Sequence, residues 1–560
     1  MLKNYDFKFA VIKFFLLSII LTPIVYYLGL QLVYKIGFLD LSFQKHFEAI
    51  YFALNMKTEQ AFSFFVYIAL FSPLLAFLPT NHLKGEYGSA AFATNNLIKK
   101  MNLFKEEGIV LGKKGSKLLK YDTPLSSLVL APPGTGKSTA ISIPNLLTVK
   151  KSMIVLDPKD ELFQITSRFR GQKFKSRIYK YNPLDEDSVK FNPFSKFFIG
   201  EVLTQNHELN EEAWNKAENI VNEVAYLIYQ EKDNYDYWIE EARSLFILLA
   251  LWLIFSKGET TLPEIRAYSM QDYTAMLDEE VEGEDSLLPF IQKEIDILEF
   301  SNIFIPNRIK EELQALRKKA DKEYSGVFGS FKSPLNIFAN SVIAKNFSTN
   351  DLDILTFRTN LSTLYISIKE KDLRQLSMLN RVFIEFIYSN LLSSMPNKND
   401  FEIVGIFDEF PRFGKLHYLI ELSSIGRAYK LPCLFIAQDY AQIKKTYNQD
   451  VISVLESTTA YKVIFPQTNE ETARRYAELI GDFTVERRNE SRNIDVKSSR
   501  SIQKQLLGQK LITKQDILSQ DSDTIYILAI NNYKNPIKAT PYIYFKDKTL
   551  TKELEKINKE

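Results

Sequence analysis

The sequence predicts an α/β protein with a mostly parallel β-sheet, an all-α domain inserted into it and two transmembrane helices before it. Three observations support this prediction. Short apolar runs alternate with helical stretches, a glycine-rich phosphate-binding loop follows one of the runs, and two uncharged apolar segments precede them all. Uniformly apolar strands separated by helices are typical of a parallel sheet that is covered on both faces.

Length and composition narrow the class of protein. A chain of 560 residues is too long for one ordinary core, so two or three domains are expected. The 70 basic and 68 acidic side chains leave a net charge of +2, which does not by itself indicate nucleic-acid binding. The single cysteine, Cys433, excludes an internal disulfide and suits a reducing compartment. Four scattered histidines cannot build a Cys/His zinc site, and the absence of an HExxH motif argues against a zinc protease.

Two apolar segments predict a membrane anchor over residues 1–84. Phe14–Tyr34 and Ala61–Leu78 carry no charge, and a spanning helix needs ~20 apolar residues. The alternatives are a cleaved signal peptide for the first segment and a buried core helix for the second, but no small-residue cleavage site follows the first. Lysines precede the first segment and follow the second, which places both ends and the bulk of the chain in the cytoplasm. They are Lys3, Lys8, Lys13, Lys84, Lys99 and Lys100.

The stretch "APPGTGKS", Ala131–Ser138, lies between an apolar strand and a helical stretch, as a phosphate-binding loop requires. Gly134 and Gly136 allow backbone N–H groups to turn toward phosphate oxygens. Lys137 would reach the β and γ phosphates, and Ser138 would offer a hydroxyl to Mg²⁺. ATP and Mg²⁺ are therefore the predicted cofactors, and a plain glycine-rich turn is the alternative. The predicted binding residues are Pro133, Gly134, Thr135, Gly136, Lys137, Ser138, Thr139 and Asp408.

The stretch "IVGIFDE", Ile403–Glu409, is the expected second half of this site. A buried strand ends in two carboxylates, of which Asp408 would hold Mg²⁺ together with Ser138, and Glu409 would orient and deprotonate the attacking water. Apolar strands ending in two acids are common by accident, so the prediction depends on the phosphate-binding loop.

Further apolar runs predict the other strands of the same sheet. They lie at 152–158, 362–368, 431–438, 460–466 and 523–530. Ligands bind at the carboxyl ends of such strands, where Asp157, Asp408 and Gln438 are expected. Gln438 is placed to sense the γ-phosphate, and a hydrogen bond at the strand end is the alternative.

About 270 residues separate Ser138 from Asp408, more than the sheet needs. Helical periodicity at 210–230, 237–255, 287–300 and 307–321 predicts an all-α domain over 198–320. It would interrupt a nucleotide-binding domain of residues 85–197 and 321–560. The apolar run that ends in "LWLIF" is too short for a third span and follows charged residues at 240–243, so a buried core helix is expected.

Several stretches together resemble the coupling ATPases of type IV secretion systems, the TraG/TraD-type conjugation proteins. They are "VLDPKDELFQITSRFR" (155–170), the Asn-Pro pairs of 181–194, "IFDEFPRFGKLHYLIELSSIGRAYKLPCLFIAQDYAQIKKTYN" (406–448) and "FPQTNEETARRYAELIGDFTV" (465–485). The resemblance covers nearly the whole chain. Two residues depart from the family pattern: Asp160 stands where a glycine is usual, and Ala131 replaces a glycine that many ATPases carry.

The resemblance implies a RecA-like motor fold and a homo-hexameric ring with ATP sites between subunits. Lys137, Glu409 and Gln438 would then be catalytic, and Arg427 would be the arginine offered across the interface, with a solvated surface arginine as the alternative. Arg412, Arg474 and Arg475 are weaker candidates for the same role.

The function implied is that of a multi-pass ATPase of the bacterial inner membrane that delivers substrates to a type IV secretion channel. The implied partners are the inner-membrane components of the secretion system, a relaxase–DNA complex or effector proteins, membrane lipids and sequence-nonspecific DNA. Residues 486–510 carry seven basic and three acidic side chains, so a polar loop that touches DNA phosphates, or is merely solvated, is expected there.

A DNA translocase and a membrane scaffold are the two alternative functions. An FtsK-like translocase of double-stranded DNA, not tied to secretion, usually carries more spans, a long linker and a winged-helix module, none of which the sequence shows. A membrane scaffold with a degenerate nucleotide site would not need the intact Lys137, Ser138, Asp408 and Glu409.

Overall fold

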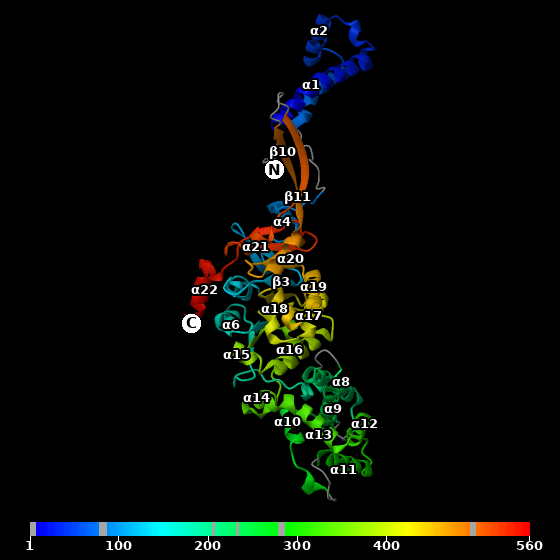
Figure 1. The fold of residues 1–560 in the computed structure, drawn as a ribbon, viewed down its shortest axis with the longest axis vertical. Helices are drawn as coiled ribbons and strands as arrows, with labels where there is room; N and C mark the ends of the chain where they lie inside the picture. The colour runs from blue at the N-terminus through cyan, green and yellow to red at the C-terminus, as the bar shows by residue number, and fades with distance from the viewer. Residues whose placement is uncertain are drawn as a thin grey trace. The chain divides into compact units, whose positions relative to one another are not determined.

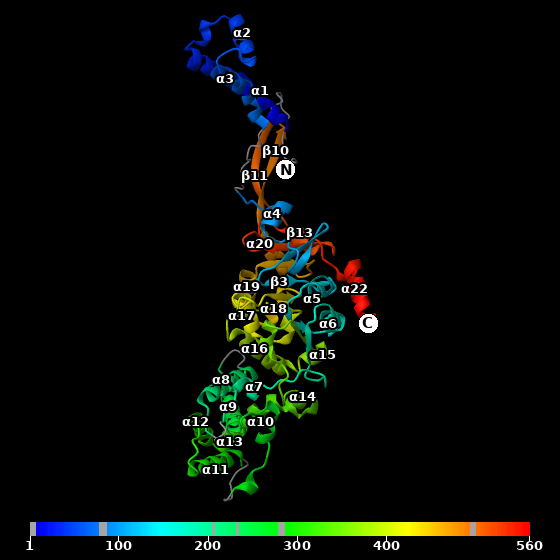
Figure 2. The same ribbon diagram turned by 180° about the vertical axis from the view of Figure 1, so that it is seen from behind.

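The computed structural model describes residues 7–77, 87–203, 208–230, 235–277, 286–492 and 500–559. The chain divides into two compact units, Met1–Glu86 and Tyr87–Glu560. Figure 1 and Figure 2 show their elements from opposite sides.

The first unit contains helices α1 (Phe7–Gly29), α2 (Phe43–Leu54) and α3 (Gln60–Phe71). A π-helical turn, Leu30–Tyr34, extends α1. Within the described residues, Phe14–Tyr34 is the one helical segment whose length and apolar composition suit a membrane span on their own, and most of it is exposed. Its bounds are those of the first predicted span.

The second predicted span, Ala61–Leu78, is not confirmed. Its described part forms the twelve-residue α3 and then a 3₁₀-helical stretch, Ser72–Phe77. Pro73 has no N–H to donate, so the α-helical ladder ends just before it. Twelve helical residues cover about 18 Å, whereas a bilayer core is ~30 Å thick. Helix α3 packs on α1 instead, and Thr22 Oγ1 donates to the carbonyl of Ala69 at 3.1 Å.

The second unit is built on a nine-stranded sheet, and the mostly parallel α/β fold predicted from the sequence is confirmed. The strand order is β13-β12-β9-β3-β8-β7-β4-β6-β5. The strands from β9 to β5 in this order are parallel, and β12 is antiparallel to both β9 and β13. Their bounds are β3 Ser127–Leu130, β4 Ser152–Asp157, β5 Arg177–Tyr181, β6 Ser362–Ser367, β7 Ile403–Phe407, β8 Cys433–Ala437, β9 Tyr461–Ile464, β12 Ile525–Ala529 and β13 Ile537–Ala539.

Alternate residues of each central strand enter two different hydrophobic cores. In β3, Leu128 and Leu130 point to one face and Val129 to the other; in β4, Ile154 and Val155 are separated in the same way. All six residues of β4 are buried. A strand that is apolar on both sides therefore has helices on both faces, which is why continuous apolar runs located these strands.

Helices cover both faces and fill the long interval between β5 and β6 (Figures 1 and 2). Two short strands, β1 (Ile109–Lys114) and β2 (Lys117–Tyr121), form a hairpin beside β13. The helices of this unit are α4 Asn95–Lys100, α5 Ile143–Thr148, α6 Glu161–Lys173, α7 Lys196–Ile199, α8 Glu211–Ile228, α9 Tyr237–Lys257, α10 Leu262–Ser269, α11 Leu287–Phe300, α12 Asn307–Arg317, α13 Asp321–Leu335, α14 Ser341–Asn346, α15 Glu370–Leu373, α16 Ser377–Leu392, α17 His417–Ile425, α18 Tyr440–Thr446, α19 Gln449–Thr458, α20 Glu470–Ile480, α21 Lys514–Leu518 and α22 Lys548–Lys559.

Helix α9 carries the apolar run that ends in "LWLIF". Every residue from Leu245 to Phe255 is buried, and α8, α12 and α13 pack against it. It is therefore a core helix, as the sequence indicated. The helices continue through α14 before the chain returns to the sheet at β6. The predicted domain bounds at residues 198 and 320 stay a prediction.

The loop predicted over 486–510 is wrong for the residues that the structure describes. They belong to a long antiparallel hairpin, β10 (Asp482–Arg492) and β11 (Arg500–Lys510), which pairs Asp482 with Lys510 and Arg492 with Arg500. Polar composition led to the error, because an antiparallel ladder can satisfy its backbone groups while most of its side chains stay polar.

A buried arginine of α6 connects α5, the helix that follows the phosphate-binding loop, to strand β6. Arg170 of α6 is 0 % exposed and donates to the carbonyls of Leu146, Val149 and Lys151 at 2.6–3.0 Å. Its Nε also donates to Thr363 Oγ1 of β6 at 2.7 Å. The positive guanidinium thus takes up carbonyl groups at the carboxyl end of α5.

We predict that Arg170→Met lowers the free energy of unfolding by ~3 kcal/mol or more, because it leaves several buried acceptors without a donor. Thermal or denaturant unfolding of the full chain measures the loss. Arg168→Met, on the same helix but exposed, is the matched control and should change stability little. Equal effects of the two substitutions would contradict the role given to Arg170.

Candidate nucleotide-binding site

The phosphate-binding loop connects β3 to a π-helical turn, Ser138–Ser142, which continues into α5. Gly134 and Gly136 have φ of +80° and +78°, the left-handed region that favours glycine. Thr135 Oγ1 donates to the carbonyl of Pro132 at 2.7 Å, and Thr139 Oγ1 donates to that of Gly136 at 2.8 Å. The loop is thus held in shape by its own hydroxyls, while Pro133 and Gly134 stay exposed.

Strand β8 lies between β3 and β7, so three predicted parts of the site meet at one edge of the sheet. The loop follows β3, Asp408 and Glu409 follow β7, and Gln438 follows β8 between them. The N–H of Ala131 donates to the carbonyl of Ala437 at 3.0 Å, which fixes the start of the loop beside Gln438.

Lys137 and Glu409 form a buried ion pair, with 2.6 Å between Nζ and Oε1. The two residues are 7 % and 3 % exposed. Burial raises the pKa of Glu409, but the hydrogen bond and charge of Lys137, with further help from Arg412 and Lys159, outweigh it and hold the pKa below its usual value. Glu409 is therefore a carboxylate at neutral pH.

Ser138 and Asp408 form the second contact across the site. Ser138 Oγ donates to Asp408 Oδ2 at 2.9 Å, and Ser142 Oγ lies 3.4 Å from the same oxygen. The other oxygen, Oδ1, is buried and has no hydrogen-bond partner among the described residues. Burial is the main cause that raises the pKa of Asp408. A hydroxyl beside an unsatisfied carboxylate oxygen is a donor set that Mg²⁺ accepts, so these residues fit the predicted metal.

The backbone of Glu409 is strained. Its φ of +50° is in the left-handed region, which side-chain-bearing residues seldom adopt. Its carboxylate also forms an ion pair with Arg412, which in turn pairs with Glu370. Arg412, a weaker candidate for a role between subunits, thus contacts Glu409 of its own chain.

The stretch Asp157–Asp160 explains one departure from the family pattern. Asp160 has a φ of +59°, a conformation that glycine adopts freely and aspartate tolerates. Its carboxylate accepts from Ser367 Oγ at 2.5 Å and pairs with Lys180 at 3.4 Å. Asp157 accepts from the N–H of Phe163 and from Ser367 Oγ, and burial raises its pKa to about 6. Asp157 thus links β4, β6 and α6.

Three predicted arginines lie outside this cluster. Arg427 follows α17, is exposed and makes no ion pair or side-chain hydrogen bond within the described residues. Arg474 is also exposed. Arg475 is engaged elsewhere in its own chain, since its Nε lies 2.7 Å and 2.8 Å from the two carboxylate oxygens of Glu456.

Sequence reasoning missed Glu385, a buried carboxylate that supports the segment after Glu409. Glu385 lies on α16, is 1 % exposed and accepts from the N–H of Tyr418 at the start of α17 at 2.9 Å. Burial raises its pKa to about 7, although nearby backbone N–H groups and Arg381 act in the opposite direction. A single glutamate in an apolar helical pattern gives no signal of this contact. Ser142 was missed as well, because a serine within a helical stretch gives no signal of its contact with Asp408.

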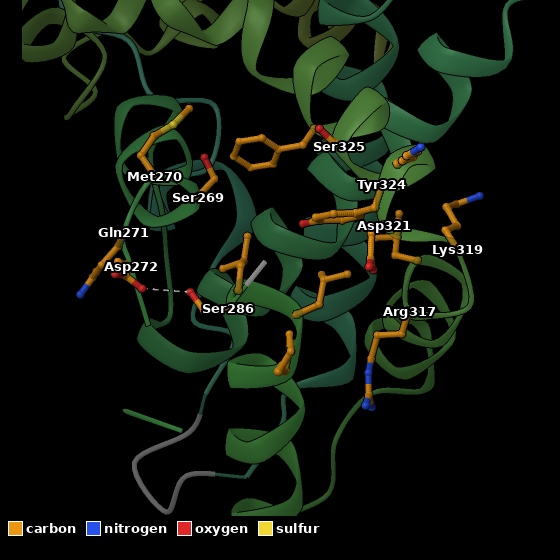
Figure 3. A pocket seen from close by; sticks show the side chains of 16 residues that line it. Ser269, Met270, Gln271, Asp272, Ser286, Arg317, Lys319, Asp321, Tyr324 and Ser325 are labelled. Atoms are coloured by element: carbon orange, nitrogen blue, oxygen red, sulfur yellow. Dashed lines mark hydrogen bonds between the residues drawn. The ribbon is translucent and has the colours of Figure 1, made fainter. Parts of the chain in front are cut away.

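The structure has a cavity of about 820 Å³ among helices α10 to α13, away from this cluster. Asp272, Ser286, Arg317, Lys319 and Tyr324 are among its lining residues, and Ser286 Oγ lies 3.4 Å from Asp272 Oδ1 (Figure 3). It contains none of the predicted site residues.

The fold and the site define the class of protein. It is a P-loop α/β protein in which a lysine and a serine of the loop face two carboxylates at the carboxyl ends of the parallel strands. The chain belongs to the T4SS-DNA_transf family, described as "Type IV secretory system Conjugative DNA transfer", whose model matches residues 83–560. The family resemblance inferred from the sequence is confirmed.

Curated relatives agree with this assignment. The chain is 27 % identical over 445 residues to protein VirD4 of Rhizobium radiobacter, covering 79 % of this chain and 60 % of that protein. It is 24 % identical over 397 residues to the conjugal transfer protein TraG of Escherichia coli, covering 66 % of this chain and 56 % of TraG. The match thus spans less than two thirds of either relative.

Solved structures show the same fold. The bacterial conjugative coupling protein TrwBdeltaN70 in its unbound form superposes with a TM-score of 0.56 at 17 % identity, covering 83 % of this chain and 97 % of that one. TrwB in complex with ADP and Mg²⁺ superposes with a TM-score of 0.54 at 17 % identity, covering 82 % and 97 %.

We predict that the stability of the chain depends on pH through Glu385. Because its pKa is raised from 4.5 to about 7, the folded state holds this proton more tightly than the unfolded state. This contribution is fully present below the unfolded value and is lost as pH rises to about 7. Wild type loses this contribution as the pH rises from about 5 to about 8, whereas Glu385→Gln does not. Over this range the free energy of unfolding of Glu385→Gln should therefore rise by ~3 kcal/mol relative to that of wild type. Thermal unfolding across this range measures the change.

Glu421→Gln is the control, because Glu421 is exposed on α17. It should leave the pH dependence of stability as in wild type. A pH dependence that is the same for wild type, Glu385→Gln and Glu421→Gln would contradict the prediction.

Proposed function

We propose that the chain is an Mg²⁺-dependent ATPase of the bacterial inner membrane that delivers substrates to a type IV secretion channel. One observation carries the proposal: Lys137 and Ser138 lie against Glu409 and Asp408, 2.6 Å and 2.9 Å apart, in a member of this family. A scaffold with a degenerate site would not need to keep all four side chains together.

The proposed roles follow from the chemistry of each group. The backbone N–H groups of Gly134–Ser138 and the Lys137 ammonium bind the phosphates. Ser138 and Asp408 hold Mg²⁺, which neutralises charge that develops on the phosphates. Glu409 is a carboxylate at neutral pH while it is paired with Lys137, and its ion pair with Arg412 does not involve Lys137, so it is able to orient the attacking water and accept its proton. The relative TrwB has been solved with ADPNP and with ADP and Mg²⁺, which supports this choice of ligands.

The Lys137–Glu409 pair gives the site two states. Without nucleotide the two side chains neutralise one another in a buried place. When phosphates attract Lys137, Glu409 loses its partner and becomes available to water. Gln438, between the loop and Glu409, is proposed to sense the γ-phosphate at that moment.

The arginine that completes the site is proposed to come from a neighbouring subunit of a homo-hexamer. Arg427 supports this arrangement because it is exposed and makes no contact with the site of its own chain. A donated arginine stabilises charge on the transferring phosphoryl group and is worth ~10³–10⁵ in rate.

The first unit is proposed to anchor the protein in the membrane. Phe14–Tyr34 is long enough to cross the bilayer, and α3 would follow it as a second, shorter apolar helix. Helix α2 exposes Phe43, Phe47 and Tyr51, spaced about one turn apart, which is the pattern of a helix that lies in the membrane interface.

The cargo is proposed to be a relaxase–DNA complex, effector proteins or both. The printed names of the relatives, conjugal transfer protein and coupling protein, support a role in DNA transfer. The cavity among α10 to α13 (Figure 3) combines aromatic Tyr324 and Phe328 with Arg317 and Lys322, so it offers both apolar and charged contacts to a protein cargo.

The test is ATP hydrolysis by the full chain in lipid nanodiscs, with and without single- and double-stranded DNA, at low and moderate salt. We expect Mg²⁺-dependent hydrolysis. Lys137→Ala should reduce it by ~10²-fold or more because phosphate binding is lost, and Glu409→Gln should bind ATP but not release phosphate.

The control is Lys150→Ala, an exposed lysine near the end of α5, which should hydrolyse ATP as wild type does. Stimulation by DNA that fades with salt would assign DNA as cargo, and DNA-independent activity would favour protein cargo. ATP hydrolysis at the wild-type rate in Lys137→Ala or Glu409→Gln would contradict the assignment of the site.

A further inference from the structure

A group of lysines lies on the hairpin β1–β2, on β13 and in the turn before β13, and β1 packs beside β13. We call Lys114, Lys117, Lys534 and Lys538 the lysine surface. Lys114 Nζ donates to the carbonyl of Lys538 at 2.6 Å, and Lys114 stands directly opposite Lys117 in the hairpin. Lys117, Lys534 and Lys538 are exposed and Lys114 is half-buried. Lys114, Lys117 and Lys538 thus lie together across two neighbouring elements, and Lys534 lies four residues before Lys538.

The charge of the lysine surface is not neutralised by the protein. None of the four ammonium groups forms an ion pair with a carboxylate among the described residues. The acidic residues of the same segment, Glu106 and Glu107, precede β1 and therefore lie at the far end of the hairpin from its turn. Three of the four side chains are exposed, and Lys117 Nζ lies 5.5 Å from the centre of the Phe104 ring.

The hairpin does not favour the pairing of Lys114 with Lys117. Lys114 and Lys117 are the last pair before a two-residue turn in which Gly115 has a φ of +61°. Like charges placed directly opposite one another destabilise an antiparallel pair. A neutral or opposite-charge pair would suit the hairpin better, so an anion outside the chain is the reason to keep both lysines.

The lysine surface lies beside the residues with which the chain begins its second unit. The N–H of Ala91 donates to the carbonyl of Lys534 at 2.8 Å, and Asn535 Nδ2 donates to the carbonyl of Ala91 at 3.0 Å. Ala91 follows the last residue of the first unit, Glu86, by five positions. Lys534 therefore lies beside the start of the second unit.

We propose that the lysine surface binds the anionic headgroups of the cytoplasmic leaflet. This inference rests on the membrane anchoring given under the proposed function. Clusters of four to eight basic residues just cytoplasmic of a membrane helix attract anionic lipid. Each lysine near the membrane surface increases the binding constant about fivefold. All four residues are lysine, a point charge suited to a fluid layer of headgroups, whereas arginine is preferred for nucleic-acid phosphates.

Lysine acetylation of the full chain tests the proposal. The chain is reconstituted in nanodiscs of phosphatidylcholine alone or with phosphatidylglycerol, labelled briefly with an acetylating reagent and read by mass spectrometry. Labelling of the lysine surface should fall about fivefold or more in the anionic discs and recover as salt rises, because salt screens the attraction. Lys318 and Lys322, exposed lysines of the helical region, should label equally in both discs.

A paired variant separates electrostatics from simple occlusion. In Lys114→Gln/Lys117→Gln, Lys534 and Lys538 should regain much of their labelling in the anionic discs. The matched control, Lys318→Gln/Lys322→Gln, should keep them protected.

Three results would overturn the proposal. One is equal labelling of the lysine surface in the two kinds of disc. Another is protection by duplex DNA in phosphatidylcholine discs with none from phosphatidylglycerol, which would make this a nucleic-acid surface. The third is a chain that inserts into neither disc, which would remove the anchoring on which the inference rests. The labelling does not depend on ATP hydrolysis, so failure of the ATPase assignment would leave this test readable.

Discussion

The buried ion pair between Lys137 and Glu409 joins two parts of the chain that are 272 residues apart, and the rest of the second unit positions its two ends. A buried pair of charges is stable only with good geometry and satisfied neighbours. The sheet provides the geometry because β8 lies between β3 and β7 and holds their carboxyl ends at a fixed spacing. Asp408, Ser138 and Arg412 surround the pair. The polar centre of the protein thus depends on the order of three apolar strands.

The long helical region is compatible with this site because of where the chain leaves the sheet. It departs after β5, the edge strand, and returns at β6, the neighbour of β5. A helical region placed in space between the adjacent strands β3 and β8 would separate the phosphate-binding loop from its carboxylates. At the edge, the helices share a hydrophobic core with the sheet and leave the nucleotide site open at the carboxyl ends of the central strands. Glu385 on α16 then connects this covering layer to α17, the helix between Glu409 and Arg427.

The parts of the fold predicted from sequence are those in which one local pattern decides the outcome. Fully buried strands such as β4 and β7 are continuous apolar runs in the sequence. The two glycines of the phosphate-binding loop indicate the left-handed backbone that they adopt. Edge strands β5 and β13 were missed because only one of the five residues of β5 is fully buried and β13 is three residues long with an exposed central residue. The hairpin β10–β11 was missed because its polar side chains give no strand pattern in the sequence, although its backbone pairs along its whole length. Pro73 shortened the second apolar helix. The contacts of Glu385 with Tyr418, of Ser142 with Asp408 and of Arg412 with Glu370 join segments far apart in the sequence, so they arise only from tertiary packing.

The most direct test of this account is a structure of the full chain with Mg²⁺ and a non-hydrolysable ATP analogue. The account predicts that Lys137 leaves Glu409 for the phosphates, while Ser138 and Asp408 contact the metal and the strands β3, β8 and β7 keep their order. A nucleotide bound elsewhere, with the Lys137–Glu409 pair intact, would contradict it.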